Sequence, residues 1–193
     1  MQRSKQHYSS FGSSGNIGKL MSRFLTYLFG FFVLVQANVL ACNFKISNFG
    51  DPKEKIVIEP VPLSFPDQFG GESLAIPIQD LCKNDNSLYG TLVVYLYIEN
   101  KLSQIQLYRP NMEDTKLMDF AMKKYGTFNL PEGMPKQRWR GNYNWEIGND
   151  YIEYISTNIH DGHAEVIEIT NKLYANAMAE YNAKVGEWLD SQK

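Results

Sequence analysis

Alternating apolar and polar positions predict several β-strands in the second half of the chain. Thr91–Ile98, TLVVYLYI, is rich in β-branched and aromatic residues, and Leu102–Tyr108 follows after the short connection Glu99-Asn100-Lys101. Such residues favour strands, and so short a connection joins antiparallel neighbours. We therefore predict a β-hairpin over residues 91–108.

Three more strands are predicted between residues 138 and 170. Arg138–Ile147 places aromatic side chains at alternate positions, and Gly148-Asn149-Asp150 turns the chain into Tyr151–His160. Asp161-Gly162 is typical of a two-residue hairpin turn and leads into His163–Thr170. These strands would extend the same antiparallel sheet.

Helical spacing of apolar residues is found in two segments. Glu113–Tyr125 has acidic residues first, lysines last and Gly126 at its end, as a helix prefers. From Asn171 onward, apolar residues recur at steps of four and three, which forms one stripe: Tyr174, Met178, Tyr181, Val185 and Trp188. The predicted fold is a two-layer α+β domain, an antiparallel sheet with hairpins and a meander that is covered on one face by two helices.

The alternation of apolar and polar residues is weaker between residues 42 and 90. Phe44–Ile46 is predicted to be extended, and Ile56–Ile58 is predicted to form a short strand. Residues 60–71, PVPLSFPDQFGG, contain three prolines and end in two glycines, so we predict a loop without a regular element. A loop of this length is either functional or folded onto the surface.

An apolar segment near the N-terminus predicts export. The run over residues 24–35, FLTYLFGFFVLV, would rise roughly 18 Å as a helix, which is short of a bilayer core of about 30 Å. Arg23 before it and Ala41 after it complete the order of a secretory signal. We predict a signal peptide over 21–41, an over-extended or disordered N-terminus over 1–20, and a single domain over 42–193. An uncleaved anchor and a buried core helix are the alternatives.

The end of this segment, Val39-Leu40-Ala41-Cys42, resembles the lipobox of bacterial lipoproteins. The resemblance covers only these four residues and the leader, and no family is recognised for the domain behind them. Val39 and Leu40 depart from the residues that the family favours at their positions. The resemblance implies cleavage before Cys42 and a lipid anchor on its sulfur.

A disulfide is the alternative fate of the same cysteine. The chain has two cysteines, Cys42 and Cys82, and exported pairs often form a bridge. A lipidated sulfur cannot join a disulfide, so the two predictions exclude each other.

The charge distribution separates the leader from the domain. Residues 1–42 contain four basic residues and no acidic one, so all 21 acidic residues of the chain lie in the remainder. An acidic domain gains nothing from releasing counterions on a polyphosphate, so we expect no nucleic-acid partner.

The predicted 160–163 turn could gather metal ligands. If Asp161 and Gly162 form the turn, His160 faces His163, and Asn158 faces Glu165 on the same side of the hairpin. Imidazoles this close could share a metal ion with Glu165. The alternative is a solvated tip without a ligand, because exposed turns prefer polar residues, and we expect no resident cofactor.

A stretch rich in basic and aromatic residues could form a binding surface. Residues 136–151, KQRWRGNYNWEIGNDY, interleave the two kinds of side chain. When exposed, these side chains could stack on glycans or bind anionic groups. When alternation turns the rings inward, they belong to the core instead. The candidate surface residues are Arg138, Trp139, Arg140, Tyr143 and Trp145.

The usual catalytic motifs are missing from the sequence, including nucleophile elbow, P-loop and zinc-protease signatures. We therefore expect an exported envelope protein, with a lipid anchor in the membrane, that binds a periplasmic or envelope protein without catalysis. Assembly factors and immunity or inhibitor proteins are the expected types. The alternative is a small hydrolase or metal-dependent enzyme that uses His160 and His163.

Overall fold

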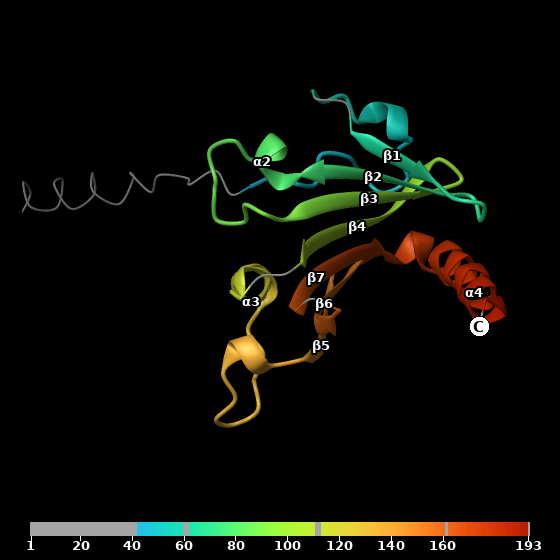
Figure 1. Cartoon of the computed structure of the whole chain (residues 1–193). Coiled ribbons are helices and arrows are strands. Elements are labelled where there is room, and N and C mark those ends of the chain that lie inside the picture. The colour runs from blue at the N-terminus through green and yellow to red at the C-terminus, as the bar shows by residue number, and fades with distance from the viewer. Residues whose placement is uncertain (1–41, 60–61, 111–112, 161, 193) are drawn as a thin grey trace, which may run out of the picture. The chain divides into compact units, whose positions relative to one another are not determined.

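The computed structural model describes residues 42–59, 62–110, 113–160 and 162–192 (Figure 1). These residues form one compact unit. The predicted N-terminal segment 1–20 and the predicted signal peptide 21–41 lie outside the described residues. Within the described part, no helix has both the length and the hydropathy that a bilayer crossing requires.

Seven antiparallel strands form a single sheet in the order β1-β2-β3-β4-β7-β6-β5. Two meanders, β1 to β4 and β5 to β7, join where β7 pairs with β4 (Figure 1). The antiparallel sheet and the α+β class predicted from the sequence are therefore confirmed. The strands are β1 (Leu63–Pro66), β2 (Gly71–Pro77), β3 (Leu92–Ile98), β4 (Lys101–Pro110), β5 (Gly141–Ile147), β6 (Asp150–Ile159) and β7 (Gly162–Asn171).

Among the described residues, three α-helices and three short 3₁₀ turns accompany the sheet. The two longer α-helices, α3 (Lys116–Tyr125) and α4 (Ala175–Ser191), lie inside the two predicted helical segments. The helix α2 (Ile78–Leu81) follows β2 directly. The 3₁₀ turns are η1 (Lys53–Lys55), η2 (Lys136–Arg138) and η3 (Lys172–Tyr174).

The helices α3 and α4 pack on opposite faces of the sheet. The odd-numbered residues Tyr95 and Tyr97 of β3 belong to the main core, together with Leu117 and Met118 of α3. The even-numbered Leu96 and Ile98 form a separate small cluster with Met178 of α4. Because successive strand residues point to opposite faces, the prediction that both helices cover one face is not confirmed.

The main core is closed by the segment that precedes β1. Phe44, which is 1% exposed, packs against the sheet and accepts a hydrogen bond on its backbone oxygen from the Tyr95 hydroxyl. This segment contains the 3₁₀ turn η1 but no strand among its described residues, so the short strand predicted over Ile56–Ile58 is wrong.

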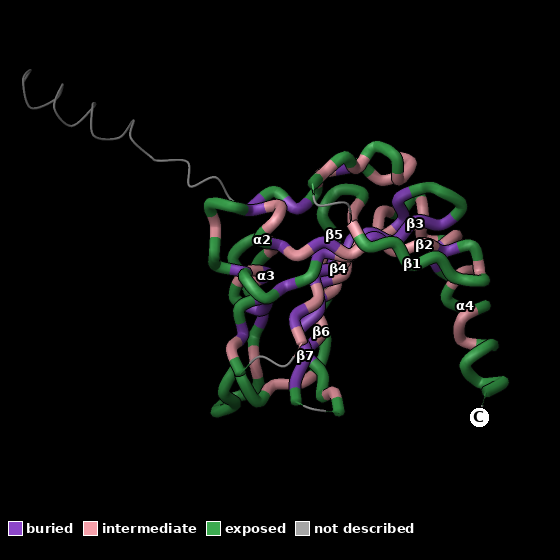
Figure 2. Tube along the Cα trace, turned by 45° about the horizontal axis from the view of Figure 1, so that its top comes forward, coloured by how far each residue is buried: buried purple, intermediate pink, exposed green. Residues whose placement is uncertain are grey.

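The loop prediction for residues 60–71 is wrong over five of those residues, the four of β1 and Gly71, which begins β2. Leu63–Pro66 form β1 and pair with Glu72–Ala75 of β2. The strand lies at the edge of the sheet, where hydrogen bonds are needed on one side only, so Pro66 is tolerated there. All four residues of β1 are exposed, and α4 is also largely exposed or half-buried (Figure 2).

Candidate functional site

The hairpin register separates the two histidines that we predicted to face each other. Strand pairing continues to Ile159 and Gly162, and Asn158 lies opposite His163, so the predicted pairing of His160 with His163 is wrong. Gly162 begins β7 with a φ of 141°, which glycine adopts easily, instead of occupying the turn. His160 consequently lies in the turn itself.

His163 points into the protein rather than toward a ligand. It is 8% exposed, and its Nε2 lies 3.0 Å from the Oγ of Ser156 on the neighbouring strand. The Ser156 hydroxyl also donates to the backbone oxygen of Trp139 at 2.8 Å. The serine and histidine thus tie the chain entering β5 to the β6–β7 hairpin.

Glu165, the third predicted metal ligand, caps a helix from the sheet. Its carboxylate is fully buried and accepts hydrogen bonds from the backbone N–H groups of Leu117 (3.1 Å) and Met118 (3.0 Å) in the first turn of α3. The Tyr154 hydroxyl donates to the same carboxylate at 2.8 Å. Burial raises the pKa of Glu165, although these three hydrogen bonds favour its charged form.

A buried arginine completes this polar end of the core. Arg109 lies beside Glu165 on the adjacent strand, is 2% exposed, and binds Asp114 through two nitrogens at 3.0 and 2.8 Å. The hydrogen bonds from Arg109 lower the pKa of the Asp114 carboxyl. Within the described residues, no group of three or more His, Cys, Asp and Glu side chains has the arrangement of a metal site.

The basic and aromatic residues of the 136–151 stretch are separated by the fold. The three aromatic rings surround Phe128, with centroid distances of 4.6 Å to Tyr143, 5.4 Å to Trp139 and 5.9 Å to Trp145. Tyr143 alone among them remains 38% exposed as a large hydrophobic residue. The rings therefore extend the core rather than forming an exposed stacking platform.

The two arginines of that stretch lie outside the ring cluster. Arg138 is exposed in η2, and Arg140 donates to the Asn158 side chain at 2.7 Å and to the backbone oxygens of Gln137 and Trp139. Arg140 is thereby held against the β6–β7 hairpin. Of the five residues predicted as one surface, the three aromatic residues thus extend the core, Arg140 ties the hairpin, and Arg138 is exposed.

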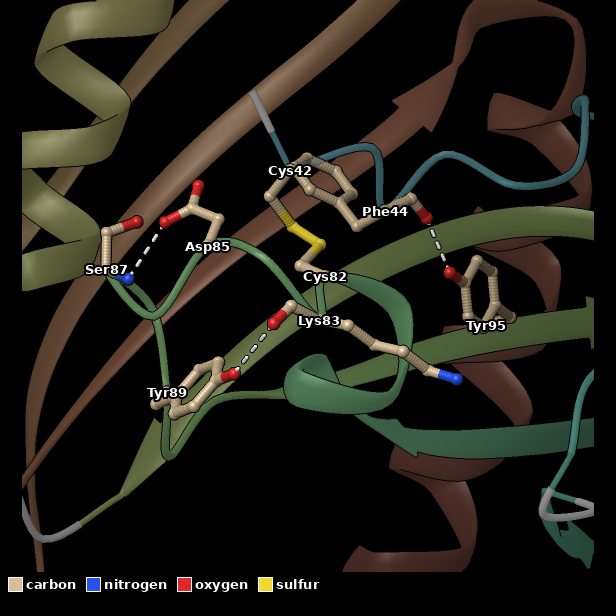
Figure 3. The surroundings of a disulfide bond; sticks show 8 residues. All are labelled: Cys42, Phe44, Cys82, Lys83, Asp85, Ser87, Tyr89 and Tyr95. Carbon is tan, nitrogen blue, oxygen red and sulfur yellow. Dashed lines mark hydrogen bonds between the residues drawn. A yellow bond between two sulfur atoms is a disulfide. The ribbon is translucent and has the colours of Figure 1, made fainter. Parts of the chain in front are cut away.

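Cys42 and Cys82 form a disulfide in the structure (Figure 3). Their Cα atoms lie 5.2 Å apart, and both residues are buried beside Phe44 and the end of α2. The bridge fixes the start of the described chain to the β2–β3 connection. The lipidation predicted for Cys42 requires the same sulfur, so it applies only to a chain in which this bridge is not formed.

The sheet face opposite the main core carries a group of polar side chains that sequence reasoning missed. Strand register aligns Gln106, Glu168, Glu153 and Asn144 in one row, and Gln104, Thr170, Tyr151 and Glu146 in the next. We call these eight residues the polar face. Because α4 packs over Leu96 and Ile98 of β3, the polar face lies beside this helix rather than beneath it.

Hydrogen bonds hold five of the eight side chains of the polar face in place. Gln104 and Gln106 donate to the two carboxylate oxygens of Glu168 at 3.1 and 2.8 Å. Glu153 lies directly opposite Glu168 on the neighbouring strand and accepts from Asn142 at 2.6 Å. Lys172 binds Glu146 at 2.9 Å.

A shallow hollow of about 400 Å³ opens over this face. Three glutamates line it, together with an asparagine, a tyrosine and a threonine: Glu146, Glu153, Glu168, Asn144, Tyr151 and Thr170. Such a surface offers mainly acceptors and negative charge, so it is suited to a partner that presents lysine, arginine or amide donors. Alternation in each strand could have indicated these residues, but the opposition of Glu153 to Glu168 depends on the register that we predicted wrongly.

Comparison of the chain with protein-family models, with curated proteins and with solved structures finds no match.

Proposed function

We propose that this chain is an exported bacterial envelope protein that binds a periplasmic or envelope protein without catalysis. The polar face is the observation that carries this proposal. Two aligned rows of hydrogen-bonding side chains on a sheet face are ordered before any partner arrives, which reduces the entropy cost of binding.

The chemistry of the polar face defines the kind of partner. Glu153 and Glu168 face each other across two strands, and Glu168 already uses both oxygens to hold two glutamines. Their negative charge favours a protein surface that carries lysine or arginine, with amide and tyrosine groups completing the contact. An assembly factor and an immunity or inhibitor protein both fit this description.

The proposed location rests on the leader and on the disulfide together. A basic residue, an apolar run and a small residue precede Cys42 in the order found in signal peptides. Disulfides such as Cys42–Cys82 persist in oxidising compartments, for example the bacterial periplasm. We propose a periplasmic protein with this bridge formed. A lipid anchor on Cys42 remains the alternative mode of attachment to the envelope.

The alternative enzymatic function receives no support from the histidines. His160 lies in the turn between β6 and β7. His163 is the second residue of β7 and is buried against Ser156 of β6. A shared metal or an acid–base pair would need both imidazoles at one accessible place.

Neutralising the two opposed glutamates tests the proposal. The full chain is affinity-tagged, its partner is captured from envelope extracts and purified, and the dissociation constant is measured for wild type and for the double variant E153Q/E168Q. We expect the double variant to bind at least about tenfold more weakly, because each lost charged contact removes on the order of 1 kcal/mol or more of binding free energy. Glutamine preserves side-chain size.

The matched control is E187Q on α4, which removes an exposed carboxylate away from the polar face. We expect its affinity to equal that of the wild type. Equal affinity of E153Q/E168Q and E187Q for the captured partner would contradict a role for the polar face.

A further inference from the structure

The two edges of the sheet differ in how they are protected against pairing. At one edge, β1 has four residues, contains Pro66 and follows Pro62. At the other edge, β5 has seven residues without proline, lysine or arginine, and its register with β6 has no shift. Natural sheets usually shield a free edge with charged residues, prolines or a bulge, and of these devices β5 has only the single charge of Glu146.

The backbone of β5 presents hydrogen-bonding groups outward at three positions. Ile147 and Asp150 close a hairpin with a two-residue turn, and Gly148 adopts a φ of 60°. In such a hairpin the closing pair exchanges both hydrogen bonds, and the exchange recurs at every second residue. The N–H and C=O groups of Asn142, Asn144 and Glu146 therefore point away from β6.

The side chains at these positions are also open to a partner. Asn142, Asn144 and Glu146 are exposed, and the Glu146 side chain keeps 62% of its surface accessible. Among the described strands, β5 is the last in the sheet order and pairs with β6 alone. The outer edge thus combines backbone groups that pair with no other described strand and exposed polar side chains.

We propose that two copies of this chain associate through their β5 edges, antiparallel, about a twofold axis at Asn144. This interaction goes beyond the proposed function, because it uses the outward backbone groups of the β5 edge, where Asn144 and Glu146 border the polar face. Three residue pairs would each exchange two backbone hydrogen bonds: Asn144 with its counterpart, and Asn142 with Glu146 in both directions.

The sequence of β5 is complementary to itself in this register. The amide of Asn142 lies opposite the carboxylate of Glu146 and can donate to it, and the two Asn144 amides can donate to each other. On the other sheet face, Tyr143 lies opposite Trp145 in a non-hydrogen-bonded pair, where facing side chains are closest. Aromatic pairs in such positions stabilise antiparallel strands.

Other antiparallel registers are less favourable. A twofold axis at Tyr143 or Trp145 leaves two hydrogen-bonded residue pairs within β5 instead of three. Axes at Asn142 and Glu146, the other residues with outward backbone groups, are the remaining alternatives. An axis at Glu146 places two glutamates opposite each other, which costs free energy. An axis at Asn142 pairs Glu146 with residue 138, which belongs to η2 rather than to a strand.

Cysteine trapping in cells that express the full chain tests this interaction. In the variant N144C, the two new cysteines would meet at the twofold axis with a Cα separation of about 5.5 Å, within the range for a disulfide. We expect a covalent dimer on non-reducing gels. L173C, at an 80% exposed residue, is the matched control and should give at most trace amounts.

A second measurement uses the purified full chain without added cysteines. We expect the wild type to have twice the chain mass by light scattering at micromolar concentration. N144K, which places two lysines at the axis, should be monomeric with an unchanged circular dichroism spectrum. A monomeric wild type, or equal trapping of N144C and L173C, would overturn the proposal.

Discussion

Glu165 illustrates what a sequence reveals about a single residue and what it conceals. Its position beside two histidines at a hairpin predicted a solvent-facing metal ligand. In the structure it is buried and accepts two backbone hydrogen bonds from α3, a helix about 47 residues earlier in the chain. Contacts between segments so distant in sequence depend on tertiary packing, which local pattern does not encode.

Replacing Glu165 by Gln should destabilise the domain. Glutamine keeps the volume but supplies one acceptor oxygen in place of two, so it cannot accept from Leu117, Met118 and Tyr154 in the same geometry. A buried donor that loses its acceptor costs about 1–3 kcal/mol. Urea denaturation should show a free energy of unfolding lower by this amount. E113Q, at an exposed residue, serves as the control and should match the wild type.

Glu165 should also leave a signature in the pH dependence of stability. Burial raises its folded-state pKa, so the folded protein binds a proton more tightly than the unfolded chain does. Where the folded state holds more protons, the free energy of unfolding falls as pH rises. As pH rises from 4.5, the ordinary pKa of a glutamate, to the raised pKa of Glu165 in the folded state, the wild type should therefore lose stability relative to E165Q. A difference curve that rises with pH over this interval would contradict the assignment.

At the scale of elements, the helix α4 was predictable but its packing was not. The stripe of apolar residues located it correctly, yet among them only Met178 is buried, and Trp188 stays 43% exposed. Periodicity identifies the side of a helix that can be buried, whereas the extent of burial depends on how far the sheet reaches beneath it. The short strand β1 was missed for a related reason, since an edge position tolerates the prolines that argued against a strand.

Two substitutions on α4 should therefore differ in effect. M178A removes the anchor in the Leu96–Ile98 cluster and should cost about 2–3 kcal/mol of unfolding free energy. L189A, at a residue that is 52% exposed, should change it by less than about 0.5 kcal/mol. Denaturant titrations of both variants give the comparison. Equal losses would mean that the second half of α4 is packed as firmly as the first.

At the scale of the whole molecule, the class of fold followed from alternation and turn residues. The β3–β4 and β5–β6–β7 strands and both long helices lie close to their predicted ranges. The register between β6 and β7 differs from the predicted one because Gly162 begins β7 instead of occupying the turn. Every residue pair along the two strands therefore differs from the prediction, including the opposed glutamates of the polar face. The candidate binding surface was therefore less predictable than the elements that build it.

The state of Cys42 connects the fold to the compartment of the protein. A bridge to Cys82 closes a loop of 40 residues and should stabilise the mature domain by roughly 3–4 kcal/mol in the chain-entropy model. Maleimide labelling of the denatured protein from the envelope should find no free thiol before reduction and two afterwards. The variant C82S should show one free thiol and lower resistance to urea. Lipidation predicts the opposite pattern: one thiol, Cys82, reacts without reduction, no second thiol appears after reduction, and the chain partitions into detergent. These outcomes are mutually exclusive because one sulfur atom cannot form both bonds.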